Sequence, residues 1–282
     1  MSKSELLSRL AYFRHPALPG VELLVANPSL EIWRMYHQRY VLCGCPSVDT
    51  SWVYRGKQRS LHDGMTAFME PGEMHCVVSK SRPSRFGALF IDEDQMLRCA
   101  EELGVHRRPH FACAETANPL VLRDLMRFSE SLQQGADTLK LQERFSAVMH
   151  RAMNFFESKP EEISSAGMNT DSLSRAREFL EEHRNESVTL DQLAAVAAMS
   201  RFHLARRFTQ EFGISPHAYL IQMRVKNACV LLREGMSCAD VAPFLGFADQ
   251  SHFTRHFKRV MGVTPGQYAH AKISSLPLYA TM

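Results

Sequence analysis

The sequence of 282 residues lacks any apolar run approaching the ~20 residues that a helix needs to cross a bilayer. Residues 1–10 have no continuous apolar core and no cleavage-like end, so we expect no signal peptide. The seven cysteines are odd in number and scattered, without the paired spacing of a metal site. These absences argue against association with a membrane and predict a protein of the cytoplasm.

The sequence also has little net charge, +3 at pH 7, but that charge is unevenly distributed. Residues 1–170 carry 20 basic and 20 acidic side chains, whereas residues 171–282 carry 13 basic and 10 acidic ones. The whole excess therefore lies in the C-terminal part, where basic residues cluster at 201–207 and 255–259. This distribution is typical of a surface that contacts phosphate, and its modest size predicts modest nonspecific affinity for nucleic acid.

Short β-branched and aromatic runs alternate with turn signals from about residue 20 to residue 91, which predicts a barrel or a sandwich. Helical spacing follows at residues 92–103. Two amphipathic helices are predicted at residues 119–134 and 138–157, and they either pack on the strands or form a dimer seam. The polar segment 159–170, which contains Pro, Gly and Ser, is typical of an interdomain linker.

Two C-terminal stretches, residues 190–216 and 238–265, each predict a short helix, a tight turn and a second helix rich in polar and basic residues. Thr189 and Gln192 form a capping box, and Ser200 and Asp249 are suitable N-caps for the second helices. Between the two units, residues 216–234 predict one helix about 28 Å long, close to the ~34 Å repeat of successive major grooves. One chain is therefore expected to read two adjacent groove segments of double-stranded DNA.

The tandem units resemble the DNA-binding domain of the AraC/XylS family of transcription regulators over about a hundred residues. The first half of the resemblance rests on Leu193, Ala194, Ser200, Leu204, Arg206, Phe208, Gly213, Ser215, Pro216 and Tyr219. The second half rests on Arg224, Ala242, Gly246, Phe247, Asp249, Ser251, Phe253, Arg255, Phe257, Lys258, Gly262, Thr264, Pro265 and Tyr268. Pro243 departs from the family pattern, and we expect it to bend the first helix of the second unit.

The resemblance implies which side chains face the DNA. In the first unit these are Arg201, Phe202, Ala205 and Arg206, and in the second they are Gln250, Ser251, His252, Thr254 and Arg255. The two arginines at 206 and 255 have the chemistry to bind guanine, Gln250 that to bind adenine, and Ala205 touches only a thymine methyl. Lys258 and Arg259 are expected to neutralise phosphate. The alternative for each position is a solvated helix face, and Phe202 has a core position as its alternative.

In the N-terminal half, residues 63–75 resemble the strand-turn-strand of cupin-type sensor domains. Cupins often hold a metal with a His-x-His pair, a Glu and a further His, but no His-x-His lies upstream of this turn. The ligand set is therefore incomplete, and we expect no metal and no cofactor. Glu73, His75 and Arg85 are the candidate effector-binding residues, with a structural histidine and a solvated loop as the alternatives.

The sequence thus predicts an α+β protein with no catalytic residues. Residues 1–158 form a cupin-like β-barrel with C-terminal flanking helices that senses an effector and dimerises. Residues 159–170 form a linker, and residues 171–272 form an all-α domain of two helix-turn-helix units joined by a long helix. We expect a homodimeric, effector-responsive activator that binds DNA and engages RNA polymerase. The alternatives are control by a protein partner instead of a small molecule, or a cupin enzyme with a DNA-binding tail.

Overall fold

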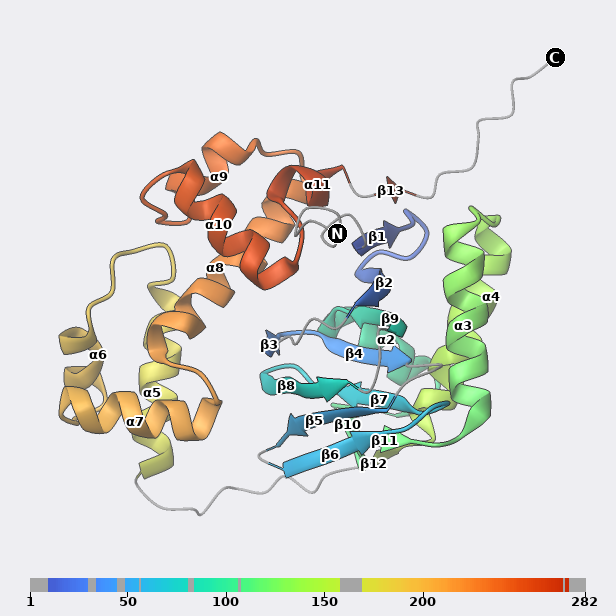
Figure 1. The fold of residues 1–282 in the computed structure, drawn as a ribbon, viewed down its shortest axis with the longest axis horizontal. Helices are drawn as coiled ribbons and strands as arrows, with labels where there is room; N and C mark the ends of the chain where they lie inside the picture. The colour runs from blue at the N-terminus through green and yellow to red at the C-terminus, as the bar shows by residue number, and fades with distance from the viewer. Residues whose placement is uncertain are drawn as a thin grey trace. The chain divides into compact units, whose positions relative to one another are not determined.

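The computed structural model describes residues 10–29, 34–44, 49–55, 57–80, 84–105, 108–157, 169–270 and 272–273 (Figure 1). The chain divides into two compact units. Unit 1 comprises Met1–Pro160 together with Ala271–Met282, and unit 2 comprises Glu161–His270. None of the helices in the described ranges is long and apolar enough to cross a membrane.

Unit 1 is built on two antiparallel sheets. The larger sheet has the order β11-β7-β4-β9-β2-β1-β13. Its strands in chain order are β1 (Leu10–Arg14), β2 (Val21–Ser29), β4 (Tyr40–Gly44), β7 (Thr66–Met69), β9 (Ser84–Ile91), β11 (Glu115–Thr116) and β13 (Lys272–Ile273). The smaller sheet has the order β3-β8-β5-β6, with β3 (Arg34–His37), β5 (Thr50–Tyr54), β6 (Lys57–Leu61) and β8 (Glu73–Lys80). The pairing is antiparallel except between β1 and β13.

The prediction of a β-rich N-terminal domain is confirmed, but the strands that the structure describes do not close into one barrel. They separate into these two sheets and a short pair of strands, β10 (His110–Phe111) and β12 (Phe156–Glu157). The core of the unit includes Phe68, Leu89, Phe111 and Phe128, each with none of its surface exposed. Apolar side chains from the larger sheet and from the helices thus bury one another, which is the main source of stability in such a layer.

In the described part of unit 1, three helices accompany the strands: α2 (Glu93–Glu102), α3 (Pro119–Gln133) and α4 (Thr138–Met153). Figure 1 shows α3 and α4 side by side along one flank of unit 1. Their apolar faces enter the core through Leu125, Leu132, Leu141 and Phe145, so both helices pack on their own unit. The predicted extension of the second helix to residue 157 is wrong, because the helix ends at Met153 and β12 then pairs with β10.

Unit 2 is all-helical over its described residues, 169–270. Its elements are α5 (Asn169–Glu182), α6 (Leu190–Val196), α7 (Arg201–Phe212), α8 (Pro216–Arg233), α9 (Cys238–Phe244), α10 (Gln250–Met261) and α11 (Pro265–Ala269). The predicted caps are confirmed: Thr189 and Gln192 form a capping box, and the side chains of Ser200 and Asp249 accept from the backbone amides of the next turn. Gly213 ends α7 in the left-handed region at φ 72°, where a side chain would be strained.

Pro243 is the penultimate residue of α9. The amide of Leu245 still bonds to the carbonyl of Val241, at 3.1 Å, and the helix ends there. Proline lacks an amide hydrogen, and here that hydrogen is missing from the last turn of a short helix. Pro243 therefore coincides with the end of α9, and there is no longer helix that it could bend.

Candidate nucleic-acid interface

The first helix-turn-helix unit consists of α6 and α7. Leu204 and Phe208 of α7 are fully buried and pack the helix against the rest of unit 2, while the opposite face of α7 is exposed to solvent. On that face Arg201, Phe202 and Arg206 are exposed and Ala205 is partly exposed. The phenyl ring of Phe202 is 86% exposed, so the alternative of a core position is wrong for this residue.

The second unit consists of α9 and α10, and it is built in the same way. Phe253 and Phe257 are fully buried, one turn apart on the inner face of α10. The predicted DNA-facing residues lie on the other side of the helix. Gln250, Ser251, Arg255 and Arg259 are exposed, and His252, Thr254 and Lys258 are partly exposed. Both second helices thus present polar and basic side chains to solvent, as the phosphates and base edges of a groove require.

One of these basic groups has an internal partner. The Nε atom of Arg201 lies 3.2 Å from a carboxylate oxygen of Asp191 on α6, and both side chains are more than half exposed. Such an exposed pair contributes little to stability, about 0–1 kcal/mol. Its effect is to orient the Arg201 side chain across the turn between α6 and α7.

Within unit 2, the long helix α8 contributes a buried arginine that links the second helix-turn-helix unit to the segment before the first. Arg224 is only 6% exposed, and its guanidinium donates to three backbone carbonyls. Nε donates to Arg184 at 2.7 Å, Nη2 to Glu186 at 2.6 Å and Nη1 to Gly246 at 2.7 Å. The sequence placed Arg224 in the family pattern without assigning it a role. The available signal was a single arginine on the apolar face of a helix, which requires several acceptors when buried.

His252 and His256 of α10 lie close to His217 of α8. The ring centroid of His256 is 4.6 Å from that of His252 and 6.4 Å from that of His217 on α8. Burial, with the positive charges of His252 and Arg259 as further causes, lowers the pKa of His256 to about 4. Burial and the charge of Arg224 also lower the pKa of His217. These two histidines are therefore neutral near pH 7 and add no positive charge to the surroundings of α10 at that pH.

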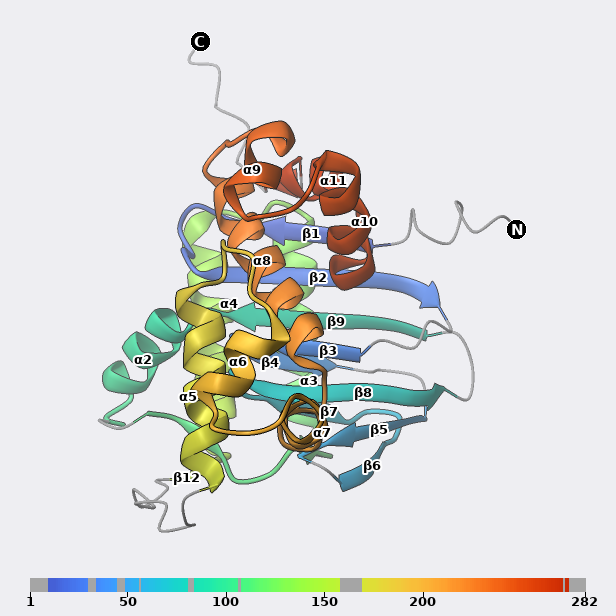
Figure 2. The same ribbon diagram turned by 90° about the vertical axis from the view of Figure 1, so that its left-hand side faces the viewer.

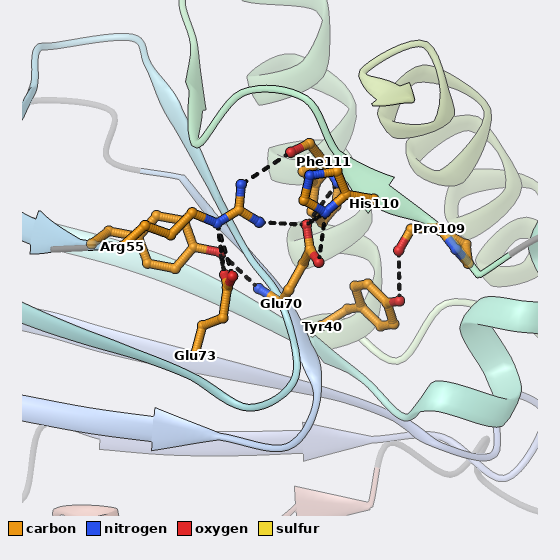
Figure 3. Close-up of polar contacts among 8 residues, drawn as sticks. Tyr40, Arg55, Glu70, Glu73, Pro109, His110 and Phe111 are labelled. Atoms are coloured by element: carbon orange, nitrogen blue, oxygen red, sulfur yellow. Dashed lines mark hydrogen bonds and ion pairs between the residues drawn. The ribbon is translucent and has the colours of Figure 1, made fainter. Parts of the chain in front are cut away.

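The candidate effector residues of unit 1 lie in or beside a network of internal polar contacts (Figure 3). Glu73 accepts from Nε of Arg55, at 2.9 Å to one carboxylate oxygen and 3.0 Å to the other, and also from the hydroxyl of Tyr54. The same arginine donates from Nη2 to Glu70 at 2.6 Å. Glu70 also accepts from the amide of Phe111 at 2.7 Å and lies 2.8 Å from Nδ1 of His110. The carboxylate of Glu73 is therefore engaged in hydrogen bonds within the protein, to Tyr54 and Arg55.

His75 is 8% exposed on β8, directly opposite Tyr54 of β5. Burial lowers the pKa of His75 to about 4, so the ring is neutral near pH 7. Arg85 lies in β9, but its side chain is outside the described part of the structure. Within that part, no three metal-ligating side chains form a group that could hold a metal ion.

The chain is similar to known helix-turn-helix transcription regulators. Residues 193–271 match a family model described as a helix-turn-helix domain. The uncharacterized HTH-type transcriptional regulator YbfI of Bacillus subtilis is 28% identical over 219 residues, which cover 77% of this chain and 79% of that protein. The HTH-type transcriptional activator RhaS of Escherichia fergusonii is 25% identical over 237 residues, which cover 79% of this chain and 82% of that protein.

The fold of the chain is also similar to a solved structure. ToxT of Vibrio cholerae superposes with a TM-score of 0.53 at 11% sequence identity, covering 89% of this chain and 97% of that chain. Two helix-turn-helix units with exposed basic faces define a DNA-binding protein. The chain is a helix-turn-helix DNA-binding transcription regulator similar to those of the AraC/XylS family, and it carries a β-rich N-terminal unit.

Proposed function

We propose that this chain is a sequence-specific, effector-responsive transcription activator that reads two adjacent major-groove segments, one with α7 and one with α10. The observation that carries the proposal is that two second helices, each with an exposed polar and basic face, are joined through one helix, α8. With 18 residues, α8 is about 27 Å long, close to the ~34 Å groove repeat.

The proposed base contacts follow from the chemistry of the exposed side chains. Arg206 and Arg255 each offer a fork of donors to a guanine, Gln250 pairs with an adenine, and Ala205 fits a thymine methyl. Lys258 and Arg259 neutralise phosphates and set the register of the helix on the duplex. Arg201, Phe202, Ser251, His252 and Thr254 complete the surface.

The proposed division of labour follows the domains expected from the sequence. Residues 1–158 sense an effector and dimerise, residues 159–170 link, and residues 171–272 bind DNA and engage RNA polymerase. RhaS is named as a transcriptional activator, which supports activation as the effect of this chain on its target genes. ToxT has been solved with a bound unsaturated fatty acid, which supports effector binding by a protein of this fold. A cupin relationship for the two-sheet unit, and effector contacts by Glu73, His75 and Arg85, stay predictions.

The test is genome-wide occupancy by the tagged protein in its native host, followed by binding of the purified protein to the recovered sequences. We expect a few sharp sites upstream of a coherent operon, each containing two half-sites about one helical turn apart. Duplexes in which the half-sites are moved apart by half a turn are expected to bind more weakly. Occupancy spread evenly over the genome, or indifference to the half-site spacing, contradicts the proposal.

A further inference from the structure

A cavity of about 300 Å³ lies in unit 1, between the turn that joins β1 to β2 and the helices α2 and α4. Figure 2 shows α2 at the edge of this unit. The floor of the cavity is apolar and includes Leu18, Cys99, Phe145 and Met149, all buried. Its volume is at the lower end of the range for ligand sites, about 300–1,000 Å³. The space therefore suits a small molecule with an apolar body.

The rim of the cavity holds polar side chains with free hydrogen-bonding capacity. Gln142 and Ser146 of α4 line it, both exposed and one turn apart on the same face of the helix. Neither side chain makes a hydrogen bond within the described part of the chain, in contrast to the mutually bonded Arg55, Glu70 and Glu73. These two groups of α4 are thus available to a ligand.

The mouth of the cavity is negative. Glu102 is the charged side chain among the described residues that line it, and it makes no ion pair within the described part. Glu102 is also the last residue of α2, whose final turn contains no basic residue. The dipole of α2 adds partial negative charge at the C-terminal end of the helix, at the same place. Both effects favour a cation and disfavour a carboxylate.

We infer that this cavity is an effector site for a small organic cation, whose apolar body fills the floor and whose ammonium group lies at Glu102 and Gln142. The inference rests on the proposed function, because an effector is meaningful only for a regulator. The ligand connects α2 to α4, whose apolar face packs in the core of the unit proposed to sense the effector. A ligand that binds one setting of α4 better than another shifts the population toward that setting.

The test uses hexylamine, hexanol and hexanoate, which share one hydrocarbon chain and differ in the charge of the head group. Their binding to the full chain is measured by calorimetry or by ligand-observed NMR. We expect the amine to bind most tightly and the carboxylate most weakly. Glu102→Gln is expected to weaken the amine about two- to fivefold, the size of an exposed charge pair, and to leave the alcohol unchanged. Ser146→Phe is expected to block all three.

The matched control is Glu143→Gln, which removes an exposed carboxylate of α4 that does not line the cavity and should leave binding of all three probes unchanged. Three results overturn the inference: no saturable binding of any probe, hexanoate binding as tightly as hexylamine, or equal losses in Glu102→Gln and Glu143→Gln. DNA binding is measured on the same preparations. Intact DNA binding without probe binding contradicts only the inference that the cavity binds a cation. Probe binding without any specific DNA binding contradicts only the proposed function.

Discussion

The Nη1 atom of Arg224 donates a hydrogen bond of 2.7 Å to the carbonyl oxygen of Gly246. Gly246 lies in the turn of the second helix-turn-helix unit, between α9 and α10. The same guanidinium bonds to the carbonyls of Arg184 and Glu186, in the segment that leads from α5 to α6, just before the first helix-turn-helix unit. One buried side chain of α8 therefore connects the turn of the second helix-turn-helix unit to the segment that precedes the first. It contributes to fixing the spacing of α7 and α10.

Arg224→Lys keeps the positive charge but removes the planar group that reaches three acceptors. An ammonium cannot bond to all three carbonyls in their present positions, so buried acceptors lose their partners. We expect unit 2 to lose about 2–4 kcal/mol of unfolding free energy, measured from its helical circular dichroism in denaturant. A two-half-site operator should lose more affinity than a single half-site. Arg233→Lys, on an exposed position of the same helix, is the control, and equal effects of the two changes would refute the role.

Gly246→Ala tests the same junction from the other side. Gly246 has φ +71°, and a Cβ atom there would lie 2.4 Å from the carbonyl oxygen of Asn185 and 3.0 Å from Nη2 of Arg224. Gly235 also has a positive φ, +92°, but a Cβ there would meet nothing within 4 Å. Both alanine variants carry backbone strain of about 1–2 kcal/mol. We expect Gly246→Ala to have clearly the lower unfolding free energy in denaturant melts. Equal unfolding free energies of the two variants would show that the backbone around Gly246 shifts to accept a Cβ atom without destabilising the protein.

The sequence predicted well what depends on neighbouring residues. Thr189, Ser200 and Asp249 were predicted as caps because a cap and its partner amide lie within three residues of each other. What depends on distant residues was missed. Phe156 has helical spacing with the residues before it, but it stacks on Phe111, at 4.3 Å between centroids, and joins β12. Local periodicity contains no information about that partner.

Buried charges were hidden from the sequence for the same reason. Glu22 is fully buried in β2, where its carboxylate accepts from Arg14 at 2.6 Å and from Arg39 at 3.0 Å. The arginines lie 8 and 17 residues away, so only the sheet brings them together. The exposed side of each second helix could be predicted because a helix has one repeating geometry. The cavity at α2 and α4 could not, because it depends on three elements packing side by side.

Arg206→Ala and Arg255→Ala test base reading by the two units. If each guanidinium reads a base, each variant should weaken the specific site by about 1–3 kcal/mol and relax the preference at one position. Lys258→Ala is the comparison, because loss of a phosphate contact should weaken all sequences equally and reduce the salt dependence. The measurement is binding to the operator and to single-base variants over a range of salt. A uniform loss for the arginine variants would assign them to phosphates instead.

Phe202→Ala separates binding from folding more cleanly than any charged position. Because the ring is 86% exposed, its removal should change the unfolding free energy by less than about 0.5 kcal/mol. Operator affinity should nevertheless fall, since the bound duplex would cover an apolar ring. Phe208→Ala is the contrasting control: its side chain is fully buried, so that variant should lose about 3–5 kcal/mol of stability. Unchanged operator affinity of Phe202→Ala would remove the ring from the interface.

His75 gives unit 1 a pH dependence whose sign can be worked out. Burial lowers the pKa of His75 from 6.5 to about 4, so the folded unit binds the proton less tightly than the unfolded chain. The stability from keeping the ring neutral is fully present above pH 6.5 and is lost as the pH falls from 6.5 towards 4. Over that window the loss amounts to about 3 kcal/mol.

Tryptophan fluorescence can follow this loss, because both tryptophans of the chain, Trp33 and Trp52, belong to unit 1. His75→Gln removes the titrating group, so its unfolding free energy should fall less steeply between pH 6.5 and 4 than that of the wild type. The difference in slope isolates His75 from the carboxylates that titrate in the same range. The exposed His150→Gln is the matched control and should keep the wild-type slope. If His75→Gln keeps it as well, the proton is taken up elsewhere, and burial of His75 does not make unit 1 acid-sensitive.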